Sequence, residues 1–310
     1  MRQIFLKDGI FILKKALFNG ILASLFFAFT FILNRSMNLS GGYWLWSACL
    51  RYLFTLPVMW ILVIFRGGTK QVFDEIRAHK KEWFLWSTVG FGFFYAPLTL
   101  ASVYGESWFV AATWQLTIVA GILLTPLSGR KIPLKNLMWS GVILIGVLLL
   151  QTSHLQNTDG HGMLTALFFI LIAAFSYPLG NRKMMEYCPK EMNAVQRVFG
   201  MTLCSIPFWL ILSAFAAVSH GLPSAGQTIQ SLCVAVFSGV AATVLFFAGT
   251  DLVRHNPKQL AVVEATQAGE VIFSLLGGVL FLGDPFPSFL GMIGILVIVA
   301  GMIGNSLASA

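Results

Sequence analysis

Three ionisable side chains, Arg51, Glu264 and Glu270, lie within long apolar stretches of the sequence. A charged group is costly in a hydrocarbon environment, and such residues usually face a partner or a water-filled path for ions or substrates. A carboxylate in this position can hold a proton and a cation in turn. We therefore expect Glu270 to form a proton or cation site. Glu264 precedes it on the same stretch, and we expect it either beside that site or at the inner entrance of the path.

Arg51 has two interpretations. At 1.5 Å per helical residue, it lies about 12 Å from one membrane face, and Glu270 lies about 16 Å from the other. These depths nearly coincide in a hydrocarbon core ~30 Å thick. Arg51 therefore pairs with Glu270 and locks two helices together, if those helices touch. Alternatively, it receives an anionic group of a substrate.

The stretch around Glu270 carries further polar residues on one side. On a helix, Thr266 and Ser274 share a stripe with Glu270, and Gln267 lies on the neighbouring stripe with Glu264. A helix that is otherwise apolar should turn such a face toward a cavity. Gln267 is therefore a candidate binding residue.

Two other apolar stretches supply three more candidates, Trp114, Gln115 and Tyr95. An indole ring can hold an organic cation by cation–π attraction, which makes Trp114 a candidate wall residue. Packing against lipid or against other helices is the alternative for both aromatic residues. Gly90 and Pro97 flank Tyr95 and are expected to interrupt its helix.

Motifs of enzymes and nucleotide-driven pumps do not occur in the sequence. It has no G-x-x-x-x-G-K-[ST] loop, no strand-based G-x-G-x-x-G, no H-E-x-x-H pair and no nucleophile elbow. Its 4 cysteines form no C-x-x-C pair, and its 5 histidines show no ligand spacing. We expect no cofactor, no metal site and no enzyme activity, so that any transport is driven by an ion gradient.

Composition identifies the membrane as the solvent of most of the chain. Of 310 residues, 57% are hydrophobic and only 10% are charged, whereas a soluble domain is roughly one quarter charged. Only helices and closed barrels satisfy the backbone in lipid, and these runs lack the alternation of barrel strands. The sequence predicts an all-α membrane protein with ten transmembrane helices, at 16–34, 43–65, 83–103, 107–128, 136–153, 162–181, 194–216, 228–252, 259–282 and 288–307.

Basic residues predict the orientation of these helices. If the N-terminus is cytoplasmic, 18 of the 20 Lys and Arg residues fall in cytoplasmic segments, Arg35 falls outside and Arg51 lies within a span. This bias follows the positive-inside rule. It predicts a multi-pass protein of the cell (plasma or inner) membrane with both termini in the cytoplasm. The net charge of +8 then reflects orientation among membrane lipids, and nucleic-acid binding is not expected.

The ten spans divide into two sets of five, in residues 1–153 and 154–310. The fourth span of each set ends in a Gly that is followed four residues later by a Pro. An odd number of spans in each set gives the sets opposite orientations in the membrane. We predict two inverted-topology five-helix repeats, a design in which substrates bind near mid-membrane between the halves. One chain supplies both halves, so a monomer suffices and a dimer is possible.

Several motifs resemble a known family. The five-plus-five arrangement is similar to that of the drug/metabolite transporter superfamily. Within it, four segments resemble the bacterial multidrug resistance efflux transporter family, namely Phe31–Gly42, Leu50-Arg51-Tyr52, Gly90–Pro97 and Ala112–Gln115. The likeness covers most of the chain and implies a membrane exporter. The small four-span multidrug exporters bind protons or drugs at a first-span glutamate, but span 16–34 contains no acidic residue.

These observations predict a secondary transporter. We expect an antiporter that exports small organic molecules, such as lipophilic cations or drugs, in exchange for protons. Amino acids or related metabolites, exported or imported, are the alternative substrates. A channel would need rings of pore-lining polar residues, and an intramembrane enzyme would need a cluster of His, Asp or Cys deep in the spans. The sequence shows neither.

Overall fold

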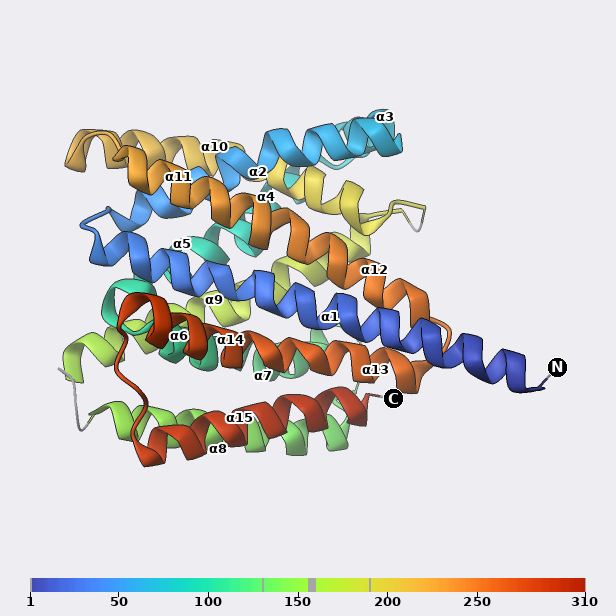
Figure 1. The fold of residues 1–310 in the computed structure, drawn as a ribbon. Helices are drawn as coiled ribbons and strands as arrows, with labels where there is room; N and C mark the ends of the chain where they lie inside the picture. The colour runs from blue at the N-terminus through green and yellow to red at the C-terminus, as the bar shows by residue number, and fades with distance from the viewer. Residues whose placement is uncertain (1, 130, 156–159, 190, 310) are drawn as a thin grey trace.

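The computed structural model describes residues 2–129, 131–155, 160–189 and 191–309, and this part of the chain forms helices and turns without strands (Figure 1). Within it, ten helical segments are long and apolar enough to cross a membrane. The predicted all-α membrane protein with ten spans is confirmed. The spans are α1 (Arg2–Leu39), α2 (Trp44–Arg66), α4 (Lys80–Ser87) with α5 (Phe93–Tyr104), α6 (Ser107–Trp114) with α7 (Leu116–Leu123), α8 (Leu134–Leu155), α9 (Gly160–Tyr187), α10 (Ala194–His220), α11 (Ala225–Val234) with α12 (Thr243–Val253), α13 (Pro257–Ala265) with α14 (Gly269–Gly277), and α15 (Phe289–Ala308).

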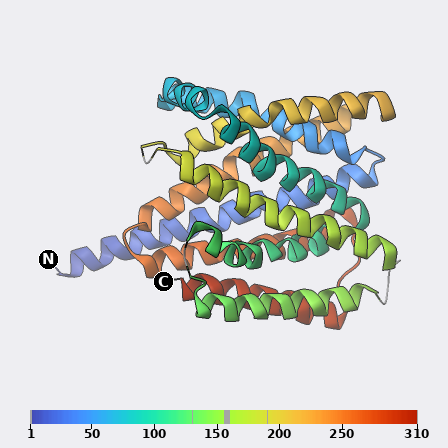
Figure 2. The same ribbon diagram turned by 180° about the vertical axis from the view of Figure 1, so that it is seen from behind.

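The two ends of the helix bundle differ in the segments that they hold. The start of α1, the end of α15 and the short helix α3 (Thr69–Ala78) lie together at one end (Figures 1 and 2). The turns that follow α9 and α12 lie there as well. Most of the Lys and Arg residues lie in these segments or close beside them in the sequence. We call this end the basic end and the other end the opposite end.

Helix α1 is longer than the apolar pattern predicts. The predicted first span stops at Asn34, but the helix continues to Leu39. Arg35 Nε lies 3.7 Å from Asp284 Oδ1. A charge that has a partner can be buried at far lower cost than a free one. The helix therefore passes through Arg35 instead of ending before it.

The helices pack in a pattern that relates the two sets of five spans. α2 packs on α10, α6 on α14 and α8 on α15, so that three spans of each set meet their counterparts in the other set. α1 packs on α12 and α14, while its counterpart α9 packs on α5 and α7. Exchanging the two sets therefore leaves these pairings unchanged.

Interruptions of the helices also recur at corresponding places. π-helical turns interrupt the third span at Thr88–Gly92 and the eighth span at Ala235–Ala242. The fourth span breaks at Gln115, and the ninth breaks at the 3-10 turn Thr266–Ala268. Irregular backbone inside a membrane is tolerated where it is buried in protein or lines a cavity. The breaks in the fourth and ninth spans place polar side chains inside the bundle.

Candidate functional site

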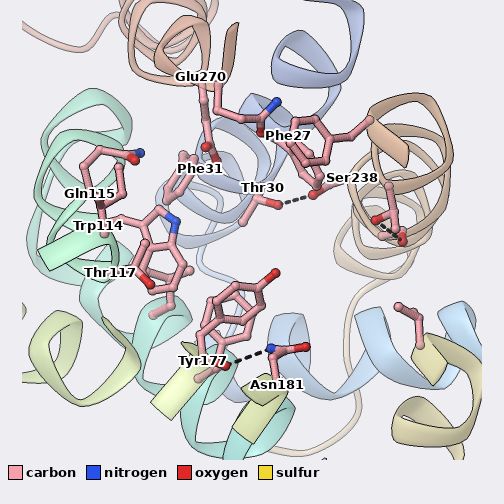
Figure 3. Close-up of a pocket in the computed structure, with 18 of the residues that line it drawn as sticks. Phe27, Thr30, Phe31, Trp114, Gln115, Thr117, Tyr177, Asn181, Ser238 and Glu270 are labelled. Carbon is pink, nitrogen blue, oxygen red and sulfur yellow. Dashed lines mark hydrogen bonds between the residues drawn. The ribbon is translucent and has the colours of Figure 1, made fainter. Parts of the chain in front are cut away.

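A cavity of about 470 Å³ lies between the two sets of helices. Its wall takes side chains from most of the spans, including α1, α2, α6, α9 and α14 (Figure 3). The lining extends from Arg51 and Leu98, nearer the opposite end, to Arg197 and Asn305 near the basic end. Its volume falls within the range of small-molecule sites. The cavity is therefore the candidate functional site.

Glu270 stands in the first turn of α14, directly after the break in the ninth span. It is only partly covered by protein because it faces the cavity, beside Phe31 in Figure 3. The side-chain amide of Gln115 lies close enough to interact with the Glu270 carboxylate. No Lys or Arg nitrogen of the described residues lies within 4.0 Å of that carboxylate. Glu270 is thus an acid in the cavity without a cationic partner in contact.

Arg51 lies on α2 with only 9% of its surface exposed. Its guanidinium donates a 3.2 Å hydrogen bond to Thr30 Oγ1 and a 3.5 Å hydrogen bond to Ser238 Oγ. Its positive charge reaches Glu270 across the cavity, but the two groups form no ion pair. The helices thus bring Arg51 and Glu270 to one cavity without joining them. The expected Arg51–Glu270 ion pair, which would have joined the second and ninth spans, is therefore not formed.

Tyr95 is fully buried and lies behind Arg51 instead of on the cavity wall. The Arg51 guanidinium carbon stands 4.0 Å from the centre of the Tyr95 ring. The Tyr95 hydroxyl accepts a 3.0 Å hydrogen bond from Asn34 Nδ2. Sequence reasoning proposed Tyr95 as a binding residue, and its observed contacts make it a support for Arg51.

Three aromatic rings form one corner of the cavity wall. Phe94 lies 5.0 Å from Trp114 and 4.8 Å from Tyr177 between ring centroids, and Trp114 lies 5.8 Å from Tyr177. In Figure 3, Trp114 and Gln115 enter from one side and Tyr177 from another. Sequence reasoning missed Tyr177, although a tyrosine that precedes Pro178 within an apolar run is a usable signal. Electron-rich ring faces of this kind attract organic cations.

Glu264 and Gln267 also line the cavity. Glu264 lies on α13, nearer the basic end than Glu270, and is partly exposed. Gln267 lies in the 3-10 turn between α13 and α14, and its buried Nε2 has no hydrogen-bond partner in the protein. An amide donor in this state is available to an acceptor on a bound molecule.

A polar cluster closes the bundle near its opposite end, and sequence reasoning missed it. The buried Asp284 carboxylate accepts hydrogen bonds from Ser107 N at 3.0 Å and Ser107 Oγ at 2.8 Å, in addition to its ion pair with Arg35. We call Arg35, Ser107 and Asp284 the polar latch. It joins α1, the start of α6 and the turn after the ninth span. The pairing of Arg35 with Asp284 has no local signal, because the two residues lie far apart in the sequence.

Metal and thiol chemistry find little support in the part of the chain that the structure describes. No group of three or more His, Cys, Asp or Glu side chains there could hold a metal ion. Cys188 lies just beyond the end of α9, and burial raises the pKa of its thiol to about 11. A protonated thiol is a poor nucleophile and a poor metal ligand.

Ten apolar spans around one cavity with polar and aromatic walls define a multi-pass membrane protein of the transporter class. Residues 14–310 match a family model described as "Putative multidrug resistance efflux transporter". The chain belongs to this family and is a membrane transporter. The resemblance noted from the motifs is thereby confirmed.

Two relatives and one solved structure are similar to this chain over most of its length. The chain is 52% identical over 308 residues to "Uncharacterized protein YjlA" of Bacillus subtilis (strain 168), covering 95% of each. It is 46% identical over 266 residues to an "Uncharacterized 42.1 kDa protein in intracellular alkaline protease 3'region" of Shouchella clausii, covering 83% of this chain and 70% of that one. A solved structure described as "Crystal structure of protein" has the same fold, with a TM-score of 0.60 at 16% identity over 96% of this chain and 98% of that one.

Proposed function

We propose that this protein is a secondary transporter of the cell membrane that exchanges protons for small organic molecules at Glu270. One observation carries the proposal: Glu270 faces a cavity of about 470 Å³, and none of the described Lys and Arg residues contacts its carboxylate. A lone carboxylate away from bulk water is costly. Binding either a proton or a substrate cation removes that cost, and the two compete for one site.

The arrangement of the helices supports alternating access as the mechanism. We infer that residues 1–153 and 154–310 are inverted repeats, because exchanging the two sets preserves both the helix pairings and the positions of the breaks. Two such repeats can rock about a site that lies between them. One chain provides both repeats, and a dimer adds nothing that this mechanism requires.

The charge of the two ends supports an orientation. We place the basic end, with both termini, in the cytoplasm, because positive residues are retained on that side of a membrane. The cavity lining then extends from mid-membrane to the cytoplasmic surface at Arg197 and Asn305. A cavity that receives its substrate from the cytoplasm favours export.

The walls support organic cations as one substrate class. Trp114 and Tyr177 line the same cavity as Glu270 (Figure 3), and aromatic ring faces together with a carboxylate attract alkyl or aryl ammonium groups. Arg51 is the observation that favours amino acids, the second class, since its guanidinium can hold a carboxylate. The chain shows no nucleophile motif or nucleotide-binding loop, so we propose no enzyme activity.

Flux measurements on purified protein in proteoliposomes test the proposal. With an imposed pH gradient, we expect uptake of benzyltrimethylammonium or of L-phenylalanine against its own gradient. Glu270→Gln should lower this flux at least tenfold, because the amide neither binds a proton nor attracts a cation. Glu186→Gln is the matched control, because Glu186 is exposed and pairs with Lys183 outside the cavity.

Two results would overturn the proposal. One is a flux that is the same with and without the pH gradient. The other is full gradient-driven flux of either probe through the Glu270→Gln variant. Flux lost equally in the Glu186→Gln control would instead expose a general defect of the reconstituted protein, which size-exclusion chromatography of each variant detects beforehand.

A further inference from the structure

Arg51 carries a buried positive charge that the proton-exchange mechanism does not use. A guanidinium has five N–H donors and no acceptor. The Arg51 guanidinium donates hydrogen bonds to the hydroxyl groups of Thr30 and Ser238. One face of the guanidinium stacks on the Tyr95 ring. None of the described carboxylates lies within 4.0 Å of the guanidinium. A buried cation held in place by neutral groups is prepared to receive an anion.

Glu270 presents the opposite charge to the same cavity. Both residues line it, and their charges interact across it without an ion pair. Arg51 is held by Thr30 on α1 and by Ser238 in the eighth span, whereas Glu270 lies after the break in the ninth span. The cavity thus keeps one positive and one negative group apart. Its complement is a molecule that carries both charges.

Further contacts indicate the body of that molecule. The same cavity wall includes the aromatic corner formed by Phe94, Trp114 and Tyr177. Gln267 Nε2 adds a donor without an acceptor. The aromatic rings fit a ligand with an apolar or aromatic body. The Gln267 amide can donate a hydrogen bond to an oxygen atom of that ligand.

We propose that the substrate is a small zwitterion with an ammonium group, a carboxylate and an apolar or aromatic body. This inference rests on the proposed function and names its substrate class. The carboxylate binds the Arg51 guanidinium, and the ammonium binds the Glu270 carboxylate beside Trp114 and Tyr177. Protonation of Glu270 removes the partner of the ammonium group and releases the substrate.

The single-charge alternatives each leave a buried group without a partner. A lipophilic cation leaves Arg51 unpaired, and a carboxylic acid leaves Glu270 unpaired. Sites with buried polar groups discriminate strongly against ligands that lack the matching group. We therefore expect on the order of 10- to 100-fold weaker binding of either analogue.

Three matched probes test this with the purified wild-type protein. L-phenylalanine carries both charges, phenethylamine lacks the carboxylate and 3-phenylpropionate lacks the ammonium group. Isothermal titration calorimetry in detergent should show L-phenylalanine binding at least tenfold more tightly than either analogue. This comparison needs no variant to fold.

Variants then assign the effect to Arg51. Arg51→Gln should abolish the preference for L-phenylalanine over phenethylamine while phenethylamine still binds, and Arg51→Lys should restore part of the preference. Ser238→Ala removes one hydrogen-bond partner of Arg51 and keeps its charge, so most of the preference should remain. Arg77→Gln is the control, because Arg77 is an exposed residue of α3 that pairs with Asp74.

The outcomes separate this inference from the proposed function. If phenethylamine binds as tightly as L-phenylalanine to the wild type, the zwitterion is wrong, while proton-coupled cation flux through Glu270 still stands. If none of the three probes binds, an apolar zwitterion is again wrong. If L-phenylalanine binds with the expected preference but no probe is moved by a pH gradient, the binding site stands and the exchange mechanism fails.

Discussion

Two regions of this bundle, its opposite end and the cavity, treat buried charge in opposite ways. Toward the opposite end, Asp284 has an ion pair with Arg35 and two hydrogen bonds from Ser107, and Asn38 Nδ2 donates a 2.7 Å hydrogen bond to Ser102 Oγ between α1 and α5. Around the cavity, Glu270 and Arg51 face open space without a carboxylate–cation contact.

This difference suggests two roles for charged residues in the bundle, one in stability and one in ligand binding. A group with all its partners stabilises one arrangement of helices, and removing one partner is strongly destabilising. A group without partners favours a bound molecule. We therefore expect the polar latch to hold α1, α6 and the turn after the ninth span together, and we propose that the cavity charges, which have no oppositely charged contact among the described residues, serve ligands.

Asp284→Ala should have the largest effect on this comparison. The change removes the carboxylate that accepts from Ser107 N and pairs with Arg35, which leaves a largely buried positive charge without its anionic partner. We therefore expect a loss of about 3 kcal/mol in the free energy of unfolding. Thermal unfolding in detergent measures it. Asp251→Ala, at an exposed site near the basic end, should change the free energy by less than about 0.5 kcal/mol. Equal melting temperatures for both variants would show that the latch does not hold the helices.

Cysteine labelling compares the access of water to the two ends. In a background without the native cysteines, Asn305→Cys at the basic end should react with a soluble maleimide at least tenfold faster than Ser102→Cys. Asn305 lines the cavity and is partly exposed, whereas Ser102 is only 2% exposed. Similar rates would contradict a bundle that is closed at the opposite end. Addition of Asp284→Ala should raise the rate at Ser102→Cys.

The protein that keeps its native cysteines allows a separate labelling measurement at Cys188, the native thiol nearest the basic end. Burial raises the pKa of Cys188 to about 11, so only about one thiolate in 10⁴ is present at pH 7. Its labelling should therefore be slow at pH 7 and rise about tenfold for each pH unit until the pKa is reached, because the thiolate is the reactive form. Fast labelling of Cys188 at pH 7 would show that it is not buried as described.

Tyr95→Phe should have the smallest effect. It removes the hydroxyl that accepts a hydrogen bond from Asn34 and keeps the ring beneath Arg51. We expect a loss of about 1 kcal/mol in the free energy of unfolding and a small change in ligand affinity. Tyr95→Leu, which also removes the ring, should weaken L-phenylalanine binding more than Tyr95→Phe does. Equal affinities in the two variants would exclude a supporting role for the ring.

Much of the fold follows from residues that can be read locally. Membrane spans are long apolar runs, and every run that was predicted is present as a helix or a broken helix. The end of a span is harder to predict where a charged residue pairs with a residue far away in the sequence. Arg35 illustrates this, because it lies within α1, which extends to Leu39, and forms an ion pair with the distant Asp284.

The candidate site was likewise predictable from the sequence only in part. Glu264, Gln267, Glu270, Trp114 and Gln115 all line the cavity, because polar or aromatic residues within apolar runs are visible in the sequence. Tyr177 escaped notice since tyrosine is also common at membrane surfaces. Whether Arg51 pairs with Glu270 could not be read from depth alone, because depth gives position along the membrane normal and not around the helix.

The sequence by itself determined the solvent, the number of spans and the presence of costly charges among them, and its basic residues predict the sidedness of the spans. These properties depend on the composition of single segments against lipid. Only the tertiary structure decided which charges are paired. Thr30 on α1 and Ser238 in the eighth span hold Arg51 away from Glu270, while Asp284 receives Arg35 and Ser107. Pairing depends on distances between segments far apart in the chain, and helix packing alone sets those distances.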